Sequence, residues 1–375
     1  MDFGRADAAR MPSAPSRGGK SRMTTMVDVA RRAGVSVATV SHVLNDTRPV
    51  RPGTRAAVLA AIDELGYTHN TLARSLVTSR TRSIGLAVSA ISNPYFTEIL
   101  QGVEAGALGA GYSLLIADPH DDPRHERKVV QLLHERRVDG MIVAPSAEPA
   151  EMVGYLARRE VPTVFLDRLV GDGHDQVCAE SAGPVRQLVE HLADLGHTRI
   201  GLVAGLPGLS TTTERVRGYR DGLRARGLLF APELLAGGGS EAAGAQDATR
   251  RLLAAPQPPT AIITANNAMT IGALQALRDL GLEVPRDIAL ACFDDFSWAD
   301  LFTPRLTAIA QPSKELGAAA VRLLLARLDD PDRPPRTVRL PCAFVHRTSC
   351  GCPEPAPPAM PPAGSPAAEE RTRTP

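Results

Sequence analysis

A short stretch near the amino end concentrates residues that could bind a polyanion. Residues 20–82 contain ten lysines and arginines against four aspartates and glutamates, a net charge of +6. The remaining residues contribute 32 basic and 37 acidic side chains, so the whole chain of 375 residues carries only +1. Because nucleic-acid-binding modules gather positive charge on one segment, this basic head on an acidic body predicts a polyanion partner.

Residues suited to catalysis or metal binding form no comparable pattern. Asp294 and Asp295 are adjacent carboxylates, but neighbours on one loop usually point apart, so no catalytic pair is expected. There is no Gly-x-Ser-x-Gly elbow, no Gly-rich phosphate loop and no nucleophile–base pair, so no enzyme is expected. Cys350 and Cys352 are closer together than zinc-knuckle cysteines and lack a second pair. The five cysteines are therefore interpreted as reduced thiols, with no metal and no cofactor.

Composition indicates a folded protein of two or three domains, with 43% hydrophobic and 22% charged residues. No apolar run is long enough to cross a membrane, and residues 1–22 lack the apolar core of a secretory signal. A cytoplasmic protein with no membrane partner is therefore expected. Residues 1–22 and 353–375 are expected to be a disordered extension and tail, with Met23 as an alternative start.

Helix signals follow the extension. Thr25, Ser36 and Thr54 are placed to cap helices over residues 26–33, 37–44 and 55–65. Gly34 stops the first of these helices, and only a tight turn separates it from the second. Two short helices joined in this way define a helix-turn-helix.

From residue 83 onward, short apolar runs alternate with amphipathic stretches. The apolar runs are 84–88, 114–117, 141–144, 164–166, 200–203, 261–263 and 288–292. The helical stretches are 95–110, 124–136, 182–195, 213–226, 241–254 and 267–280. This alternation predicts parallel sheets with helices on both faces, and its length predicts two lobes. Ligands would bind at the carboxyl ends of the strands.

The stretch DVARRAGVSVATVSHVLN, from Asp28 to Asn45, resembles the DNA-binding helix-turn-helix of the LacI/GalR repressor family. RAAVLAAIDELGY (55–67) and NTLARSL (70–76) resemble the third helix and the hinge helix of that family, and the similarity continues to RTSCGCP (347–353). The resemblance implies an all-α helix-turn-helix head followed by an α/β two-lobed periplasmic-binding-protein-like domain with two doubly wound parallel sheets.

The resemblance also implies domain boundaries. The helix-turn-helix would occupy residues 24–68, the hinge helix and linker 69–82, and the effector-binding and dimerisation domain 83–352. Within that last domain, the N-lobe is expected at about 83–180 and 312–332, and the C-lobe at about 181–310 and 336–352.

In such a head the second helix enters the major groove. The resemblance assigns base reading to Val37, Ala38 and His42. Val37 and Ala38 can make only apolar contacts, whereas His42 can form a hydrogen bond with a base edge. Three polar neighbours are expected to bind phosphate instead: Thr39, Ser41 and Asn45. Val40 is expected to pack in the core, and packing alone is an alternative for Val37.

The hinge helix of the family corresponds to residues 70–77. The resemblance gives Leu76 the role of a minor-groove wedge, flanked by Ala73 and Arg74. A helix this short is unstable alone, so it would fold only against a partner copy and DNA. His69 stands where the family usually has proline, which would soften the start of the helix. An ordinary contact with the body is the alternative for Leu76.

The resemblance places an effector, a mono- or disaccharide, between the lobes. Nine positions match the sugar-contacting pattern of the family: Asn93, Tyr95, Phe96, Asp167, Arg168, Arg215, Asn267, Asp294 and Gln311. Trp298 is predicted as a tenth effector residue, because it is the sole tryptophan of a chain with only 4% aromatic residues and lies beside a cleft loop. Carboxylates, amides and guanidinium groups would meet sugar hydroxyls, and aromatic rings would cover the apolar face. Ion pairs between the lobes are the alternative for Arg168 and Arg215.

Three departures from the family pattern bear on this site. Ala179–Glu180 stands where many relatives carry an Asp–Asn pair, and Asn266–Asn267 stands where they usually carry Asn–Asp. Both changes remove an aspartate, although Glu180 could replace part of the lost chemistry. Residues 237–240 lack an aromatic side chain, which leaves room for a larger ligand.

The sequence therefore predicts a homodimeric transcriptional regulator, expected to be a repressor. It would bind a pseudo-palindromic operator in double-stranded DNA and change its DNA affinity when the lobes close on a ligand. The alternative is a sugar-binding protein of the same fold that does not bind DNA; the basic helical head and the lack of an export signal argue against it.

Overall fold

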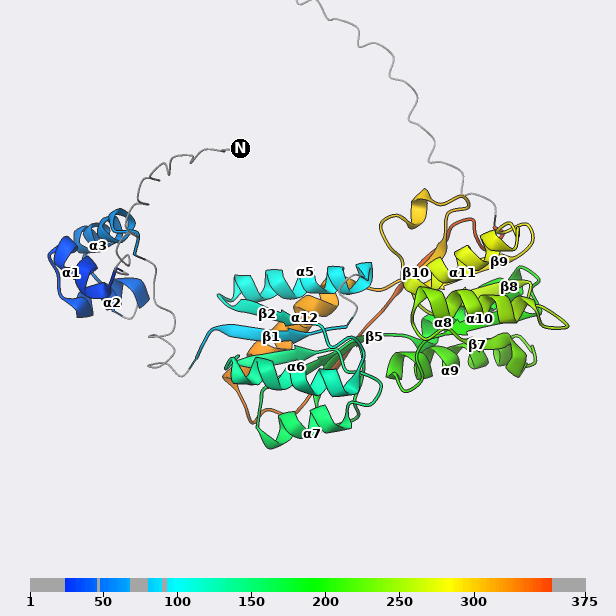
Figure 1. Ribbon diagram of the computed structural model, residues 1–375, viewed down its shortest axis with the longest axis horizontal. Helices are drawn as coiled ribbons and strands as arrows, with labels where there is room; N and C mark the ends of the chain where they lie inside the picture. Colours follow the sequence, from blue (N-terminus) through cyan, green and yellow to red (C-terminus); the bar gives the residue numbers. More distant parts are fainter. Residues whose placement is uncertain (1–23, 46–47, 68–79, 90–92, 353–375) are drawn as a thin grey trace, which may run out of the picture. The chain divides into compact units, whose positions relative to one another are not determined.

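The computed structural model describes residues 24–45, 48–67, 80–89 and 93–352 (Figure 1). The chain divides into two compact units, residues 1–79 and 80–375, each with its own hydrophobic core. The expected extension, the hinge stretch 70–77 and the tail lie outside the described residues. No helix among the described residues is both long and apolar enough to span a bilayer.

The first unit contains three helices, α1 (Met26–Ala33), α2 (Val37–Asn45) and α3 (Pro52–Glu64). Thr25 and Asp28 form a reciprocal capping box on α1, and Gly34 ends that helix at a φ of 65°. The Ser36 hydroxyl accepts a hydrogen bond from the Thr39 amide at 3.1 Å, so it caps α2 as expected. The helices pack around a small buried core: Val29, Ala30, Val40, Val43, Val58, Ala61 and Tyr67.

The start of α3 differs from the prediction. The helix begins at Pro52, and no side chain caps it, so Thr54 lies inside its first turn. Proline suits the first helical position because its φ is already helical and it has no amide hydrogen to satisfy. Pro52 is therefore a stronger helix-start signal than Thr54.

The second unit contains two lobes, each built on a six-stranded sheet. The N-lobe sheet is entirely parallel and has the order β11 (Thr337–Leu340), β5 (Asp175–Ala179), β4 (Thr163–Leu166), β3 (Gly140–Val143), β1 (Ser83–Ala87) and β2 (Ser113–Ala117). Helices α5 (Pro94–Gly109) and α12 (Ser313–Asp329) pack together on one face. Helices α6 (Pro123–Glu135) and α7 (Ala150–Arg158) cover the other.

The C-lobe sheet has the order β12 (Ala343–Val345), β10 (Thr307–Ala310), β9 (Ala289–Phe293), β8 (Ala261–Thr264), β6 (Ile200–Ala204) and β7 (Leu235–Gly237). Only β12 is antiparallel to its neighbour. Helix α8 (Ala182–Asp194) packs on α9 (Ser210–Ala225), and α10 (Ala242–Leu253) packs on α11 (Asn267–Asp279). Two short 3₁₀ turns complete this lobe, η1 (Pro232–Leu234) and η2 (Ala299–Leu301).

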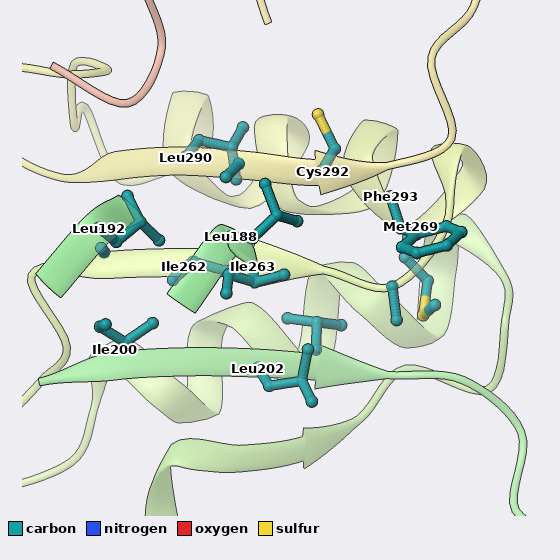
Figure 2. Packing of buried hydrophobic residues seen from close by; sticks show 14 of the residues in the cluster. Leu188, Leu192, Ile200, Leu202, Ile262, Ile263, Met269, Leu290, Cys292 and Phe293 are labelled. Atoms are coloured by element: carbon teal, nitrogen blue, oxygen red, sulfur yellow. The ribbon is translucent and has the colours of Figure 1, made fainter. Parts of the chain in front are cut away.

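Apolar side chains fill the space between each sheet and its helices. Figure 2 shows Leu188 and Leu192 of α8 beside the strand residues Ile200, Ile262 and Leu290, all of them fully buried. Because helices cover both faces of such a sheet, its strands are continuously apolar rather than alternating. The predicted pair of doubly wound sheets is confirmed.

The chain passes between the lobes after β5, after β10 and after β11. The last passage differs from the expected boundary. Strand β11 pairs in parallel with β5, from Thr337 opposite Gln176 to Leu340 opposite Ala179, so it belongs to the N-lobe. Assigning all of 336–352 to the C-lobe was therefore wrong. The apolar pattern of so short a segment does not reveal which of two open sheet edges it will join.

Candidate functional site

Two aspartates occupy equivalent places in the two lobes. Asp167 directly follows β4 and Asp294 directly follows β9, and each of these strands is third in its own sheet. Both residues have positive φ angles, 68° and 72°, which residues other than glycine rarely adopt. Such strain persists where surrounding structure enforces it and is frequent at ligand sites.

A cavity of about 40 Å³ lies between these aspartates, lined by residues of both lobes. Seven of the ten predicted effector residues line it: Asn93, Tyr95, Phe96, Asp167, Arg168, Arg215 and Asp294. Since a water molecule needs about 10–15 Å³ by this measure, the cavity holds about three. A neighbouring hollow of about 360 Å³ is lined by Asn93 and by two more predicted residues, Asn267 and Trp298.

A chain of polar contacts connects the two aspartates. The Tyr95 hydroxyl donates to Asp167 Oδ1 at 2.6 Å. The Gln311 amide donates to Asp294 Oδ1 at 2.6 Å, and its oxygen lies 3.3 Å from the Tyr95 hydroxyl. Gln311, the tenth predicted residue, thus holds Tyr95 and Asp294 in place without lining the cavity itself.

Burial changes the acidity of two of these groups. Burial raises the pKa of Asp294, although the charge of Arg215 and the Gln311 hydrogen bond act to lower it. Burial and the adjacent Asp167 raise the pKa of Tyr95 well above its ordinary value. Tyr95 is therefore a neutral hydrogen-bond donor, while Asp294 favours surroundings rich in donors, such as a ligand with several hydroxyls.

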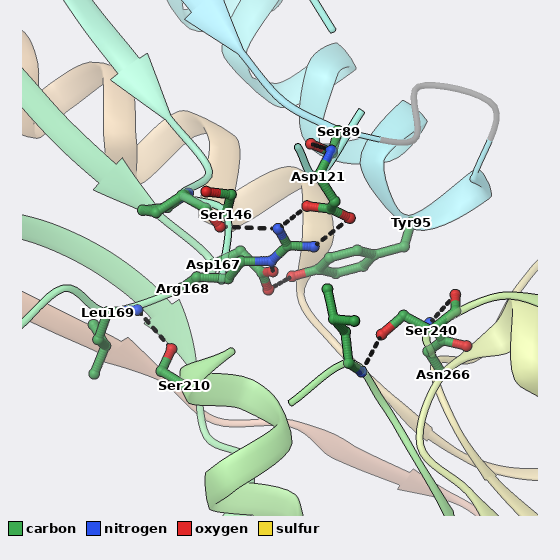
Figure 3. Close-up of polar contacts among 12 residues, drawn as sticks. Ser89, Tyr95, Asp121, Ser146, Asp167, Arg168, Leu169, Ser210, Ser240 and Asn266 are labelled. Atoms are coloured by element: carbon green, nitrogen blue, oxygen red, sulfur yellow. Dashed lines mark hydrogen bonds and ion pairs between the residues drawn. The ribbon is translucent and has the colours of Figure 1, made fainter. Parts of the chain in front are cut away.

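Arg168 is already occupied by protein groups. Its guanidinium forms a forked ion pair with Asp121 and donates to the Pro145 carbonyl at 2.9 Å (Figure 3). Its Nε lies 3.6 Å from Asp167, and its charge sits 5.9 Å from the centre of the Phe96 ring. All of these partners belong to the N-lobe, so the expected alternative of an ion pair between lobes does not describe Arg168. Through these contacts, Arg168 orients the side chains of Asp167 and Phe96.

Arg215 differs from Arg168 because it has no ion pair. It is only 8% exposed, its guanidinium lies 3.8 Å from the centre of the Phe293 ring, and it donates to the Ala265 carbonyl. Its Nε has no hydrogen-bond partner, and no carboxylate of the described chain pairs with it. A buried cation with unsatisfied donors is costly, so this group is available for a ligand that accepts hydrogen bonds.

Two further hydrogen bonds join the lobes beside the cavity. The Asn267 amide donates to Asn93 Oδ1 at 2.7 Å, and Asn93 also caps α5 by accepting from the Tyr95 amide at 2.9 Å. The Ser210 hydroxyl at the start of α9 accepts from the Leu169 amide at 2.8 Å (Figure 3). The lobes are therefore in a closed arrangement around the aspartates.

Trp298 is not brought to the cavity. It is 38% exposed beside the larger hollow and packs on Phe296, with ring centres 4.3 Å apart. Its expected role as a cover over a sugar ring would require a ligand that reaches that hollow.

The departures at Glu180 and Asn266 now have a structural setting. Asn266 caps α11 by accepting from the Met269 amide at 2.7 Å, and it donates to the Ser240 carbonyl at 3.1 Å. Its side chain is thus used by the fold, although it lines the cavity. Glu180 is not among the residues around the cavity, so it does not replace a lost aspartate there.

Some lining residues were not predicted, notably Thr211, Thr212 and Ser240. Asp121 was missed as the partner of Arg168. The two threonines lie in the first turn of α9, one helical turn before Arg215, and this spacing is the signal that could have identified them.

On the head, α2 presents its first turn to solvent. Val37 is 41% exposed and Ala38 is exposed, while Val40 packs in the core as expected. Thr39, Ser41 and His42 are partly exposed. Asn45 is the last residue of α2, and the hinge residues Ala73, Arg74 and Leu76 lie outside the described residues. An exposed valine and alanine at the start of a helix leave a flat apolar surface, the kind that fits a thymine methyl group.

Comparison with known proteins gives matches along the whole described chain. The family model for bacterial regulatory proteins of the lacI family matches residues 25–70, and the model for a periplasmic binding protein-like domain matches residues 189–350. The ribose operon repressor of Escherichia coli is 36% identical over 329 residues, covering 87% of this chain and 100% of that protein. The HTH-type transcriptional repressor PurR of Pectobacterium atrosepticum is 35% identical over 330 residues, covering 87% and 97%.

Among solved structures, the lac repressor dimer bound to operator and the anti-inducer ONPF matches with a TM-score of 0.79 at 29% identity. That match covers 88% of this chain and 99% of the lac repressor chain. Head, lobes and the order in which they follow one another are therefore shared with these relatives. The chain belongs to the lacI family of bacterial regulatory proteins and is a DNA-binding transcriptional regulator.

Proposed function

We propose that this regulator is a homodimeric repressor whose operator affinity is set by a monosaccharide, of the pentose class, bound between the lobes. The observation that carries the proposal is the buried Arg215 guanidinium, whose Nε has no hydrogen-bond partner and which forms no ion pair with any described residue. It lines the same small cavity as Asp167 and Asp294. A polyol offers acceptors to the arginine and donors to both carboxylates. It also adds no charge to the site.

The cavity volume supports a small sugar over a disaccharide. Room for about three water molecules corresponds to a compact ligand that displaces them, with modest opening of the lobes. A disaccharide would need to extend into the neighbouring hollow beside Trp298. The relative named ribose operon repressor favours a pentose, since it shares 36% identity across its full length.

The exposed surface of the body supports a homodimer. Leu108 near the end of α5 is 68% exposed, and Ile116 on the neighbouring edge strand β2 is 45% exposed. Exposed apolar side chains on adjacent elements are typical of an interface. A two-fold dimer would present two copies of α2 to the two halves of a pseudo-palindromic operator. Such a protein acts where the chromosome is, in the cytoplasm, and carries out no reaction of its own.

A thermal-shift screen of the full chain tests the effector class. Pentoses, hexoses, disaccharides, sugar phosphates and nucleobases would each be added in large excess, since a ligand at about 100 times its Kd adds ~2.7 kcal/mol of stability. We expect a pentose, with D-ribose as the first probe, to raise Tm. The increase should vanish in Arg215→Met and persist in Arg224→Met, which removes an exposed arginine of the same helix.

A shift by a nucleobase or disaccharide alone would overturn the pentose assignment. DNA selection then tests the regulator itself: fragments retained from a random double-stranded pool should converge on an inverted repeat, and the active sugar should lower their affinity. Retention without any shared sequence would contradict the operator proposal.

A further inference from the structure

Four potential metal ligands meet in the C-lobe, away from the effector cavity. His191 lies in α8, His346 directly follows β12, and Cys350 and Cys352 lie in the turn that ends the described chain. Their ligand atoms all lie within 4.8 Å of one another. None of these residues lines the cavity between Asp167 and Asp294.

The distances are close to those of a tetrahedral site. Bond lengths of about 2.0–2.1 Å for Zn–N and 2.3 Å for Zn–S place neighbouring ligand atoms roughly 3.3–3.8 Å apart. Cys352 Sγ is 3.8 Å from His191 Nε2, within that range. No two of the four ligand atoms are more than 4.8 Å apart, so the other pairs need to move only slightly closer to reach this range.

The backbone around the cysteines is held firmly. The Ser349 hydroxyl donates to the Leu290 carbonyl at 2.6 Å and accepts from the Thr307 amide at 2.8 Å, which ties the turn to β9 and β10. Gly351 has a φ of 93°, a conformation that favours glycine. This reversal between the two cysteines brings both sulfur atoms to the same group of ligands.

Cys350 is held in place by burial and by a hydrogen bond to its sulfur. This residue is fully buried, and the Thr307 hydroxyl donates to its Sγ at 3.2 Å. A hydrogen bond of this kind orients a sulfur ligand.

The two imidazoles are also positioned by packing. The ring of His191 meets that of His346 edge to face, with centres 5.1 Å apart, and lies 5.2 Å from the ring of Phe344. Phe344 therefore packs against the imidazole of His191. Among donor sets, two thiolates with two imidazoles suit Zn²⁺ in tetrahedral coordination.

We propose that His191, His346, Cys350 and Cys352 form a Cys₂His₂ site that binds one zinc ion and fastens the end of the C-lobe to α8. The sequence by itself predicts no metal here, because Cys350 and Cys352 are closely spaced and lack a second pair. His346 lies four positions before Cys350, and the fold supplies His191, which is separated from Cys352 by 161 positions. Bound zinc would join α8, β12 and the terminal turn, so it stabilises the C-lobe without touching the effector.

Cobalt binding to the reduced full-length protein tests the site directly. Co²⁺ in a tetrahedral thiolate site absorbs strongly in the visible region and in a thiolate charge-transfer band. We expect these bands to saturate at one Co²⁺ per chain and to disappear when Zn²⁺ is added. Zinc removal should also lower Tm by several degrees, because binding energy at a structural site is folding energy.

Matched variants locate the ligands. Cys352→Ser and His191→Asn should lose the cobalt bands, whereas Cys178→Ala, at a buried cysteine on β5 in the other lobe, should keep them. Absence of tetrahedral bands in the reduced wild-type protein would overturn the proposal, and this readout does not depend on how any variant folds. Equal metal binding by wild type and Cys352→Ser would overturn it too. So would mass spectra showing a Cys350–Cys352 disulfide that persists under mild reduction. Sugar binding is measured separately, so failure here leaves the effector proposal intact.

Discussion

Replacing Arg215 with methionine should separate effector affinity from protein stability. Most buried arginines stabilise a fold through an ion pair, and their removal leaves a carboxylate without its partner. Arg215 has no such partner: it donates to one backbone carbonyl, lies on Phe293 and leaves its Nε unsatisfied. Methionine is flexible and apolar, so it can retain much of the contact with the Phe293 ring.

The magnitudes follow from these contacts. A hydrogen bond from a charged donor is worth ~1.5–3 kcal/mol, so losing two of them to a sugar weakens binding by at least ~3 kcal/mol. At about 1.4 kcal/mol for each factor of ten, Kd should rise more than ~100-fold. Without ligand, loss of the hydrogen bond to the Ala265 carbonyl is offset by removal of a buried charge, so Tm should change by only a few degrees.

Calorimetric titration with the sugar found by the thermal-shift screen measures the first effect, and thermal unfolding of ligand-free protein measures the second. Arg224→Met serves as control, because Arg224 lies on the same helix with its side chain 79% exposed. A Kd within threefold of wild type would refute the assignment of Arg215 to the ligand. A fall in ligand-free Tm of more than ~10 °C would show that Arg215 supports the fold instead.

Four further outcomes are expected. His42→Ala should cost ~1–3 kcal/mol at one operator position, measured by fluorescence anisotropy on operator variants; equal loss on every sequence would contradict base reading. Leu76→Ala should weaken operator binding and leave effector affinity unchanged, and an unaltered operator Kd would reject the wedge. Burial raises the pKa of Asp294 above its unfolded value, so its contribution to stability is present at low pH and lost as the pH rises through that raised pKa; Asp294→Asn should therefore exceed wild type in Tm at neutral pH, with a gap that closes on acidification. Tyr95→Phe should destabilise by ~1–3 kcal/mol in urea unfolding because Asp167 loses a buried donor, and no change would show that water replaces the hydroxyl.

Local signals predicted the head well. Thr25, Ser36 and Gly34 act within one helical turn of their own positions, so their roles depend little on the rest of the chain. The alternation of apolar and amphipathic segments likewise predicted two parallel sheets, because strands covered on both faces must be apolar throughout. The start of α3 was the exception, since two local signals competed there and Pro52 prevailed over Thr54.

The residues of the effector site could be predicted only in part from the sequence. Resemblance to the family identified seven of the fifteen residues that line the cavity, including Asp167 and Asp294. It did not separate Arg168, which Asp121 already occupies, from Arg215, which remains available. That difference depends on which side chains meet in space, and residue type alone is the same for both.

By itself, the sequence determined the order of domains, the helix caps, the class of fold and the family. These properties depend on short-range periodicity and on motifs whose members are neighbours along the chain. Tertiary structure alone decided that β11 joins the N-lobe, that Asn266 donates to the Ser240 carbonyl, and that His191 meets Cys350 and Cys352. Each of these depends on residues far apart in sequence, whose meeting is set by how sheets and helices pack rather than by any local preference.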